Sequence, residues 1–161
     1  MFQSIDQNAK NMIDNIIKRT SKGLDFLKKS DEIDYDKKLK ESSIKFVTFD
    51  EVCSMHEHLG LISNDLLRPN LLESAINRPI NIFLYNDETS IPMLGSELCF
   101  GVVQNHPFID GNKRVAMICL YYFLEKNNMR FDFDQMFIAN LILQLANHNI
   151  TLEVFKDKVS K

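Results

Sequence analysis

The chain has 161 residues, 45% of them hydrophobic and 25% charged, a composition ordinary for one globular domain with a full core. A formal net charge of −3 argues against a general nucleic-acid-binding or anionic-membrane surface. We find neither a secretory hydrophobic segment nor an apolar run long enough to span a bilayer, so we expect a cytoplasmic protein, with export as an effector left open.

The N-terminal segment carries apolar residues at spacings of three and four, from Phe2 to Ile17. This period predicts an amphipathic helix over residues 3 to about 20, and Gly23 weakens an extension to Leu27. We interpret residues 1–45 as a helical extension that ends in a short helix or linker. Its apolar stripe indicates packing or an interface. A membrane-surface role is less favoured, because the polar face is mixed.

Two capping boxes are expected next along the chain. Thr48 is followed three residues later by Glu51, which predicts a helix start, and Asn70 with Glu73 repeats the pattern. We expect the second helix to end near Pro79, because the residue before a proline disfavours the α region.

The pattern changes after Pro79. Apolar and other residues alternate and are followed by a polar cluster at 86–89, which predicts a short β-hairpin over residues 80–92. The alternating residues are Ile80, Asn81, Ile82, Phe83 and Leu84.

Helices are predicted for the rest of the chain. One covers residues 93–104, and a second, over 115–127, is apolar almost all round and should be central in the bundle. Asp132 or Asp134 should cap the next helix, and Thr151 the last.

The chain has three cysteines, Cys53, Cys99 and Cys119. Their number is odd and they lie in predicted helices, so reduced thiols are expected. The fold class is all-α, a helical bundle with one small hairpin.

Nine residues from His106 to Arg114, His-Pro-Phe-Ile-Asp-Gly-Asn-Lys-Arg, run directly into the central helix. The N-terminus of that helix points free N–H groups and the positive end of its dipole into the loop, where an anion can bind. Gly111 lets the backbone approach phosphate oxygens closely, and Lys113 and Arg114 add positive charge. The segment therefore predicts a phosphate-binding site.

The same segment carries acid–base chemistry. His106 has an imidazole, which can take a proton from an attacking hydroxyl near neutral pH. Asp110 offers hard oxygen ligands that suit a Mg²⁺ shared with phosphates. Phe108 lies between these two polar residues and should turn inward as an anchor.

This segment resembles the Fic/Doc signature His-Pro-Phe-x-Asp/Glu-Gly-Asn-Gly/Lys-Arg, and every specified position is filled. Residues 48–59 (TFDEVCSMHEHL) and 70–79 (NLLESAINRP) are similar to segments of the Doc, or death-on-curing, branch. The resemblance implies a Fic-like helical fold and a Fic/Doc domain at residues 46–161.

The resemblance also implies a function, transfer of part of ATP to a hydroxyl side chain of a target protein. His106 would be the base, and Asp110 would hold Mg²⁺. Gly111, Asn112, Lys113 and Arg114 would surround the phosphates, with Phe108 as the structural anchor. Residues 80–84 would form a flap that binds the target's main chain by strand addition, and an ordinary surface hairpin is the alternative.

Two chemistries are open within this resemblance. Fic enzymes usually transfer the nucleotidyl group (AMPylation), whereas Doc enzymes phosphorylate a threonine of translation elongation factor Tu and belong to toxin–antitoxin pairs. Lys113 stands where the usual Fic motif has glycine, which favours phosphorylation. The inhibitory pattern Ser/Thr-x-x-x-Glu-Gly/Asn is missing from both terminal regions of the sequence, so any silencing is expected from a separate antitoxin.

Other functions stay open. A non-catalytic interaction module is an alternative, although loss of the motif base or acid, which would favour it, is not seen. A zinc site at Cys53, His56 and His58 is disfavoured, because His58 falls on another helix face.

Overall fold

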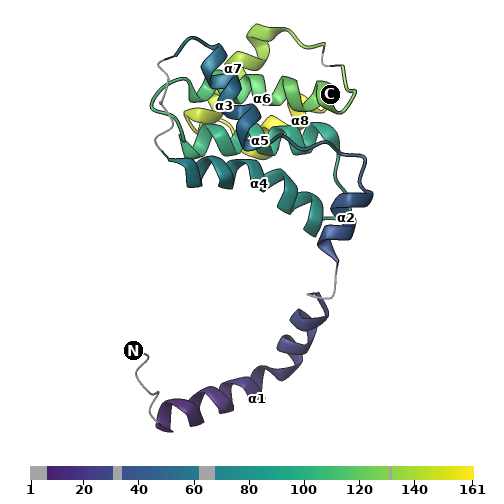
Figure 1. Ribbon diagram of the computed structural model, residues 1–161, viewed down its shortest axis with the longest axis vertical. Helices are drawn as coiled ribbons and strands as arrows, with labels where there is room; N and C mark the ends of the chain where they lie inside the picture. Colours follow the sequence, from purple (N-terminus) through teal and green to yellow (C-terminus); the bar gives the residue numbers. More distant parts are fainter. Residues whose placement is uncertain (1–6, 31–33, 62–67, 131) are drawn as a thin grey trace. The chain divides into compact units, whose positions relative to one another are not determined.

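The computed structural model describes residues 7–30, 34–61, 68–130 and 132–161, with the backbone alone described for 26–30. Within these ranges the chain forms eight helices and no strand, so the all-α prediction is confirmed (Figure 1). The helices are α1 (Gln7–Ser30), α2 (Tyr35–Glu41), α3 (Phe49–His58), α4 (Pro69–Tyr85), α5 (Ile91–Asn105), α6 (Asn112–Lys126), α7 (Gln135–Ala146) and α8 (Leu152–Val159). Among the described helices, none combines the length and apolar character needed to cross a bilayer.

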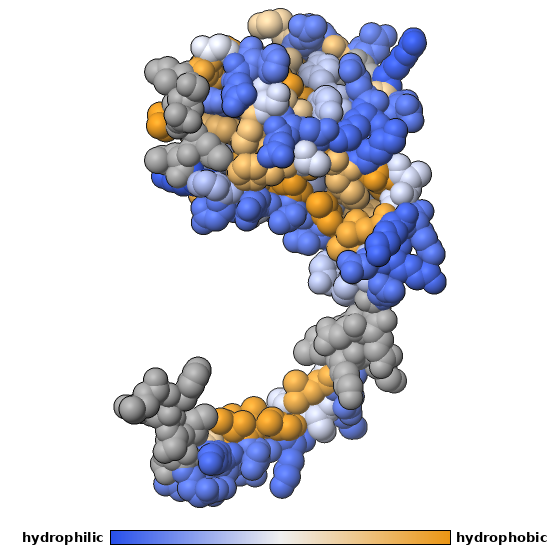
Figure 2. Space-filling view, viewed as in Figure 1, coloured by the Kyte–Doolittle hydropathy of each residue, from blue (hydrophilic) through white to orange (hydrophobic). Residues whose placement is uncertain are grey.

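The chain divides into two compact units, Met1–Ser42 and Ser43–Lys161. The first unit holds α1 and α2. Helix α1 continues through Gly23, beyond the predicted end near residue 20. A row of hydrophobic residues follows one side of α1 in Figure 2 and faces solvent; it comprises Met12, Ile13, Ile16, Ile17 and Leu24.

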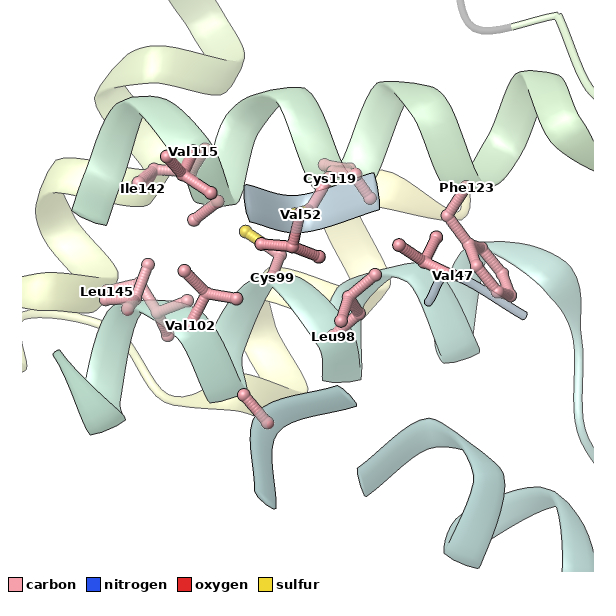
Figure 3. Close-up of a cluster of buried hydrophobic side chains, with 14 of the residues drawn as sticks. Val47, Val52, Leu98, Cys99, Val102, Val115, Cys119, Phe123, Ile142 and Leu145 are labelled. Atoms are coloured by element: carbon pink, nitrogen blue, oxygen red, sulfur yellow. The ribbon is translucent and has the colours of Figure 1, made fainter. Parts of the chain in front are cut away.

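The second unit is built around α5, which packs against α4, α6, α7 and α8. Side chains of α5 and α6 point toward one another between the two helices in Figure 3, where Leu98, Cys99 and Val102 of α5 face Cys119 and other residues of α6. The helix after the motif was predicted to be apolar almost all round and central. Its inner residues are fully buried, but Tyr122 and Glu125 are exposed, and α5 rather than α6 occupies the centre of the unit, so this prediction is wrong in position. Burial raises the pKa of the free thiols Cys99 and Cys119, the latter to about 12.

Three of the predicted caps are confirmed. Thr48 and Glu51 form a reciprocal capping box at α3, and Asp134 and Thr151 accept backbone N–H groups at the starts of α7 and α8. The cap predicted at Asn70 is wrong. Helix α4 already begins at Pro69, whose missing N–H suits the first helical position.

The predicted hairpin over residues 80–92 is wrong. Helix α4 passes through Pro79 to Tyr85, a short connection follows, and α5 begins at Ile91. The flap residues Ile80, Asn81, Ile82, Phe83 and Leu84 are therefore helical. Because a helix satisfies its own N–H and C=O groups, residues 80–84, all of them described, lack the open edge that strand addition requires.

The physical reason is a helical apolar stripe that continues across the proline. Leu72, Ala75, Ile76 and Pro79 are all buried on one side of α4, and the partly buried Ile82 and Phe83 extend that side against the core. The rings of Phe83 and Phe46 lie 5.8 Å apart. A proline inside a helix costs about 3 kcal/mol relative to alanine, and burial of this stripe offsets that cost.

Candidate active site

The motif occupies the loop between α5 and α6 and the first residues of α6. Helix α5 ends at Asn105, and His106 follows in the left-handed conformation, with φ 45° and ψ 58°. The second left-handed residue is Gly111, φ 81°, immediately before α6. These two residues turn the chain sharply at each end of the loop, and they leave the side chain of His106 exposed.

A cleft of about 560 Å³ opens at this loop. The motif residues that line it are His106 and 109–114, and the lining also includes Met117, one turn further along α6, and three residues of α7, namely Ala139, Ile142 and Leu143. The structure therefore brings six of the seven predicted motif residues to one cavity, together with apolar side chains of α6 and α7. The seventh, Phe108, is buried behind the loop.

The N-terminus of α6 contributes to this cleft. No side chain caps its first N–H groups, so they are available to an anion, and the helix dipole adds positive potential. Gly111 is required at the turn, because a Cβ there would lie 2.3 Å from Cδ1 of Leu61 in addition to the strain of a positive φ.

Asp110 presents an exposed carboxylate at the mouth of the cleft. Its Oδ1 accepts a hydrogen bond from the backbone N–H of Gly111 at 2.6 Å, and its Oδ2 accepts one from Nη2 of Arg114 at 2.9 Å. The Gly111 N–H, followed by the Arg114 guanidinium, holds the pKa of Asp110 below its ordinary value. The carboxylate is therefore ionised near neutral pH and available to a hard cation.

Asn112 uses its side chain within the loop. Its Oδ1 accepts from the N–H of Phe108 at 3.0 Å, and its Nδ2 donates to the carbonyl of the same residue at 2.8 Å. This pair of bonds holds the loop against the first turn of α6. Lys113 and Arg114, by contrast, project from that turn as exposed cations beside the cleft.

His56 was not predicted at this site. It comes from the last turn of α3, its side chain is buried, and its Nε2 lies 3.1 Å from the carbonyl oxygen of Asp110. Its ring stacks on Phe108, with centroids 4.2 Å apart and planes 7° from parallel. One feature of the sequence could have indicated that His56 points inward: it follows the apolar Val52 by four residues, so both lie on the same face of α3. The alternative zinc site is not supported, since the described residues include no cluster of three metal-ligating side chains.

Two further hydrogen bonds join the loop to neighbouring segments. The N–H of Arg68 donates to the carbonyl of Pro107 at 3.1 Å, and Nδ2 of Asn105 donates to the carbonyl of Leu71 at 2.9 Å. The start of α4 is thus attached to both sides of His106. These contacts come from residues distant in sequence, so the loop geometry depends on tertiary packing.

Comparison with known proteins adds one match. Residues 46–124 match the Fic/DOC family, over a range that begins before α3 and ends within α6. No curated protein matches the chain. The three α7 residues of the cleft lie outside the matched range. The complete motif, His106 to Arg114, lies inside the range that matches the Fic/DOC family.

Proposed function

We propose that this protein is a Fic/Doc-type transferase that uses ATP to modify a hydroxyl side chain of a target protein. Members of the Fic/DOC family are generally ATP-dependent transferases that act on proteins. The observation that carries the proposal is the convergence of one histidine, one ionised carboxylate, two cations and an uncapped helix N-terminus on a single cleft. These are the groups that phosphate-transfer chemistry requires.

His106 is proposed as the general base. Its side chain is exposed at the cleft, on a left-handed residue fixed between the end of α5 and Pro107. An imidazole in this position can take the proton of an incoming hydroxyl as the oxygen attacks phosphorus. Gly111, Asn112, Lys113 and Arg114 are proposed to surround the phosphates. Asn112 would take part through its backbone N–H at the start of α6, because its side chain is bonded to Phe108, the structural anchor.

The site suits a Mg²⁺ ion that is shared with the phosphates of ATP. Asp110 supplies an exposed, ionised carboxylate beside the helix N-terminus, and Mg²⁺ commonly binds one or two carboxylates plus substrate phosphates. When bound, the ion would neutralise charge on the phosphate oxygens. Asp110→Ala should therefore remove both activity and its dependence on Mg²⁺.

Within this proposal we favour Doc-like phosphorylation over AMPylation. Lys113 places a long cationic side chain at the first turn of α6, where the usual Fic motif has glycine. This ammonium should displace the α-phosphate from the helix N-terminus and favour a pose with the γ-phosphate near His106. A toxin silenced by a separate antitoxin, with elongation factor Tu as target, is the biological setting that we propose.

The test is which phosphate of ATP reaches the target. The protein is incubated with Mg²⁺ and either bacterial lysate or purified elongation factor Tu, in parallel with α-labelled and γ-labelled ATP. Phosphorylation transfers only the γ label and adds about 80 Da, the mass of one phosphoryl group. Transfer of the α label alone would instead establish AMPylation.

Two variants sharpen this test. Lys113→Gly should reduce γ-label transfer and permit some α-label transfer, because it restores the glycine of the usual Fic motif. Lys158→Gly, which alters an exposed lysine of α8, is the control and should leave the ratio of the two labels unchanged. Absence of transfer with both labels and both target preparations would favour the non-catalytic interaction module.

A further inference from the structure

We propose that His56, which lies outside the motif, is a positioning residue that orients the Asp110–Gly111 peptide and, through it, the carboxylate of Asp110. The consequence of this positioning for catalysis rests on the proposed function above. The effect of His56 on the conformation of the loop is independent of that function. His56 is buried, with 4% of its surface exposed, and it approaches the loop from α3, 54 residues earlier in the chain.

His56 contacts Phe108 and Asp110, and its ring lies beside Gly111. Its ring stacks on the buried ring of Phe108. Its Nε2–H donates to the carbonyl oxygen of Asp110 at 3.1 Å, since a carbonyl can only accept. A Cβ built on Gly111 would lie 3.7 Å from Nε2 and Cδ2 of the same ring. The imidazole is therefore packed directly beneath the peptide that joins Asp110 to Gly111.

The peptide unit transmits this contact to the carboxylate. The carbonyl of Asp110 and the N–H of Gly111 belong to one planar trans peptide, so they point in opposite directions and rotate together. His56 holds the carbonyl end, and the N–H end donates to Oδ1 of Asp110 at 2.6 Å. Rotation of this plane would break both bonds at once. The hydrogen bond from His56 thus determines where the carboxylate points.

Arg114 alone does not fix the carboxylate in this way. Its pair with Asp110 lies at the surface, with side-chain exposures of 50% and 68%, and exposed ion pairs constrain geometry weakly. Asn112 fixes the main chain at Phe108, two residues earlier. His56 is the described side chain that hydrogen-bonds the carbonyl of the Asp110–Gly111 peptide.

Two substitutions separate hydrogen bonding from packing. His56→Phe keeps an aromatic ring against Phe108 and removes the donor. His56→Gln loses the stacked ring and keeps an amide N–H near the position of Nε2. The matched control is His58→Phe, because His58 lies on the same helix, is exposed, and donates from Nδ1 to the carbonyl of Ser54 at 2.7 Å within that helix.

The first readout needs neither ATP nor a target. Hydrogen exchange of the Gly111 amide, followed by NMR on the full chain, should be at least tenfold faster in His56→Phe than in the wild type. His56→Gln should recover part of the protection, and His58→Phe should match the wild type. Unchanged Gly111 exchange in His56→Phe would overturn the proposal. If His56→Phe does not fold, His56→Leu, which also removes the donor, gives the same test on a folded chain: Gly111 exchange equal to that of His58→Phe would overturn the proposal.

The second readout separates positioning from general stability. In the transfer assay, His56→Phe should lower kcat about tenfold and raise the Mg²⁺ concentration for half-maximal activity several-fold, with KM for the target protein unchanged. Wild-type values of kcat and of the Mg²⁺ midpoint would show that the contact does not position the carboxylate. If the wild type itself transfers no label, the proposed function fails, and the exchange rates of Gly111 still decide what His56 does.

Discussion

The two units of the chain are both helical, yet they use their apolar residues in opposite ways. Helix α1 of the first unit exposes its isoleucines and Met12 by 45–66%, whereas most residues of α5 in the second unit are buried. The spacing of three and four residues between apolar positions correctly predicted that α1 is a helix. The comparison teaches that periodicity identifies an apolar face, while only tertiary packing determines whether that face is covered.

The candidate functional residues also lie in the second unit alone, among the residues that the structure describes. The motif, its cleft and every buried hydrophobic residue among those described lie between Val47 and Val159. We therefore expect substitutions in the second unit to have large effects and matched substitutions in the first to have small ones.

The largest effect is expected at His106. His106→Asn should lower transfer about 10²- to 10⁴-fold, because asparagine cannot act as the base, and it tolerates the left-handed backbone at this position. The thermal unfolding midpoint should stay close to that of the wild type, since the side chain is exposed. His58→Asn is the control. Wild-type turnover of His106→Asn in the label-transfer assay would contradict the catalytic reading.

A second comparison uses one glycine from each unit. A Cβ at Gly101 would lie 2.9 Å from Cα of Ala75, so Gly101→Ala must push α5 away from α4, at a cost of about 1–3 kcal/mol. A Cβ at Gly23 of α1 would meet nothing within 4 Å, and Gly23→Ala should stabilise its helix by about 0.5–1 kcal/mol. Denaturant unfolding followed by circular dichroism measures both. Equal effects at the two sites would contradict the comparison.

A third comparison concerns two glutamate–lysine pairs. Burial alone would raise the pKa of Glu51, but hydrogen bonds from Lys126, the Thr48 N–H and Tyr122 outweigh it and lower the pKa from 4.5 to about 2. Because the folded-state pKa is depressed, the stabilisation is present above pH 4.5 and is lost as the pH falls toward 2. The pair Lys37–Glu41 of α2 is exposed and 3.9 Å long.

Glu51→Gln should therefore lower the free energy of unfolding at pH 7 by about 1–2 kcal/mol, and it should flatten the loss of stability between pH 4.5 and 2. Glu41→Gln should change it by less than about 0.5 kcal/mol. Urea unfolding at several pH values tests both variants. A wild-type pH profile for Glu51→Gln would show that this carboxylate does not link α3 to α6 energetically.

The smallest effect is expected from removal of residues 1–42. Residues 43–161 form a compact unit of their own, so the shortened chain should fold and should transfer label within about twofold of the full chain. Size-exclusion chromatography and the transfer assay check this. A large rise in activity would reveal an inhibitory role for the first unit, and a loss of folding would show that its apolar face stabilises the second.

Prediction from sequence succeeded where the determining interactions are local. The capping box of Thr48 and Glu51 needs only two residues three positions apart, and the N-caps Asp134 and Thr151 likewise bond within their own first turns. It failed at α4, where the local signal of Pro79 indicated a helix end. Burial of a stripe against Phe46 and the core outweighed that signal.

The sequence by itself determined the chemical groups of this protein: the imidazole of His106, the carboxylate of Asp110, the cations of Lys113 and Arg114, and a glycine that permits a left-handed turn before a helix. These properties belong to residue types and to spacing along the chain. Tertiary structure alone decided which apolar faces are covered, that Ile142 and its neighbours on α7 line the cleft, and that His56 reaches the Asp110 carbonyl. Those contacts join residues far apart in sequence, and their geometry exists only after the helices have packed.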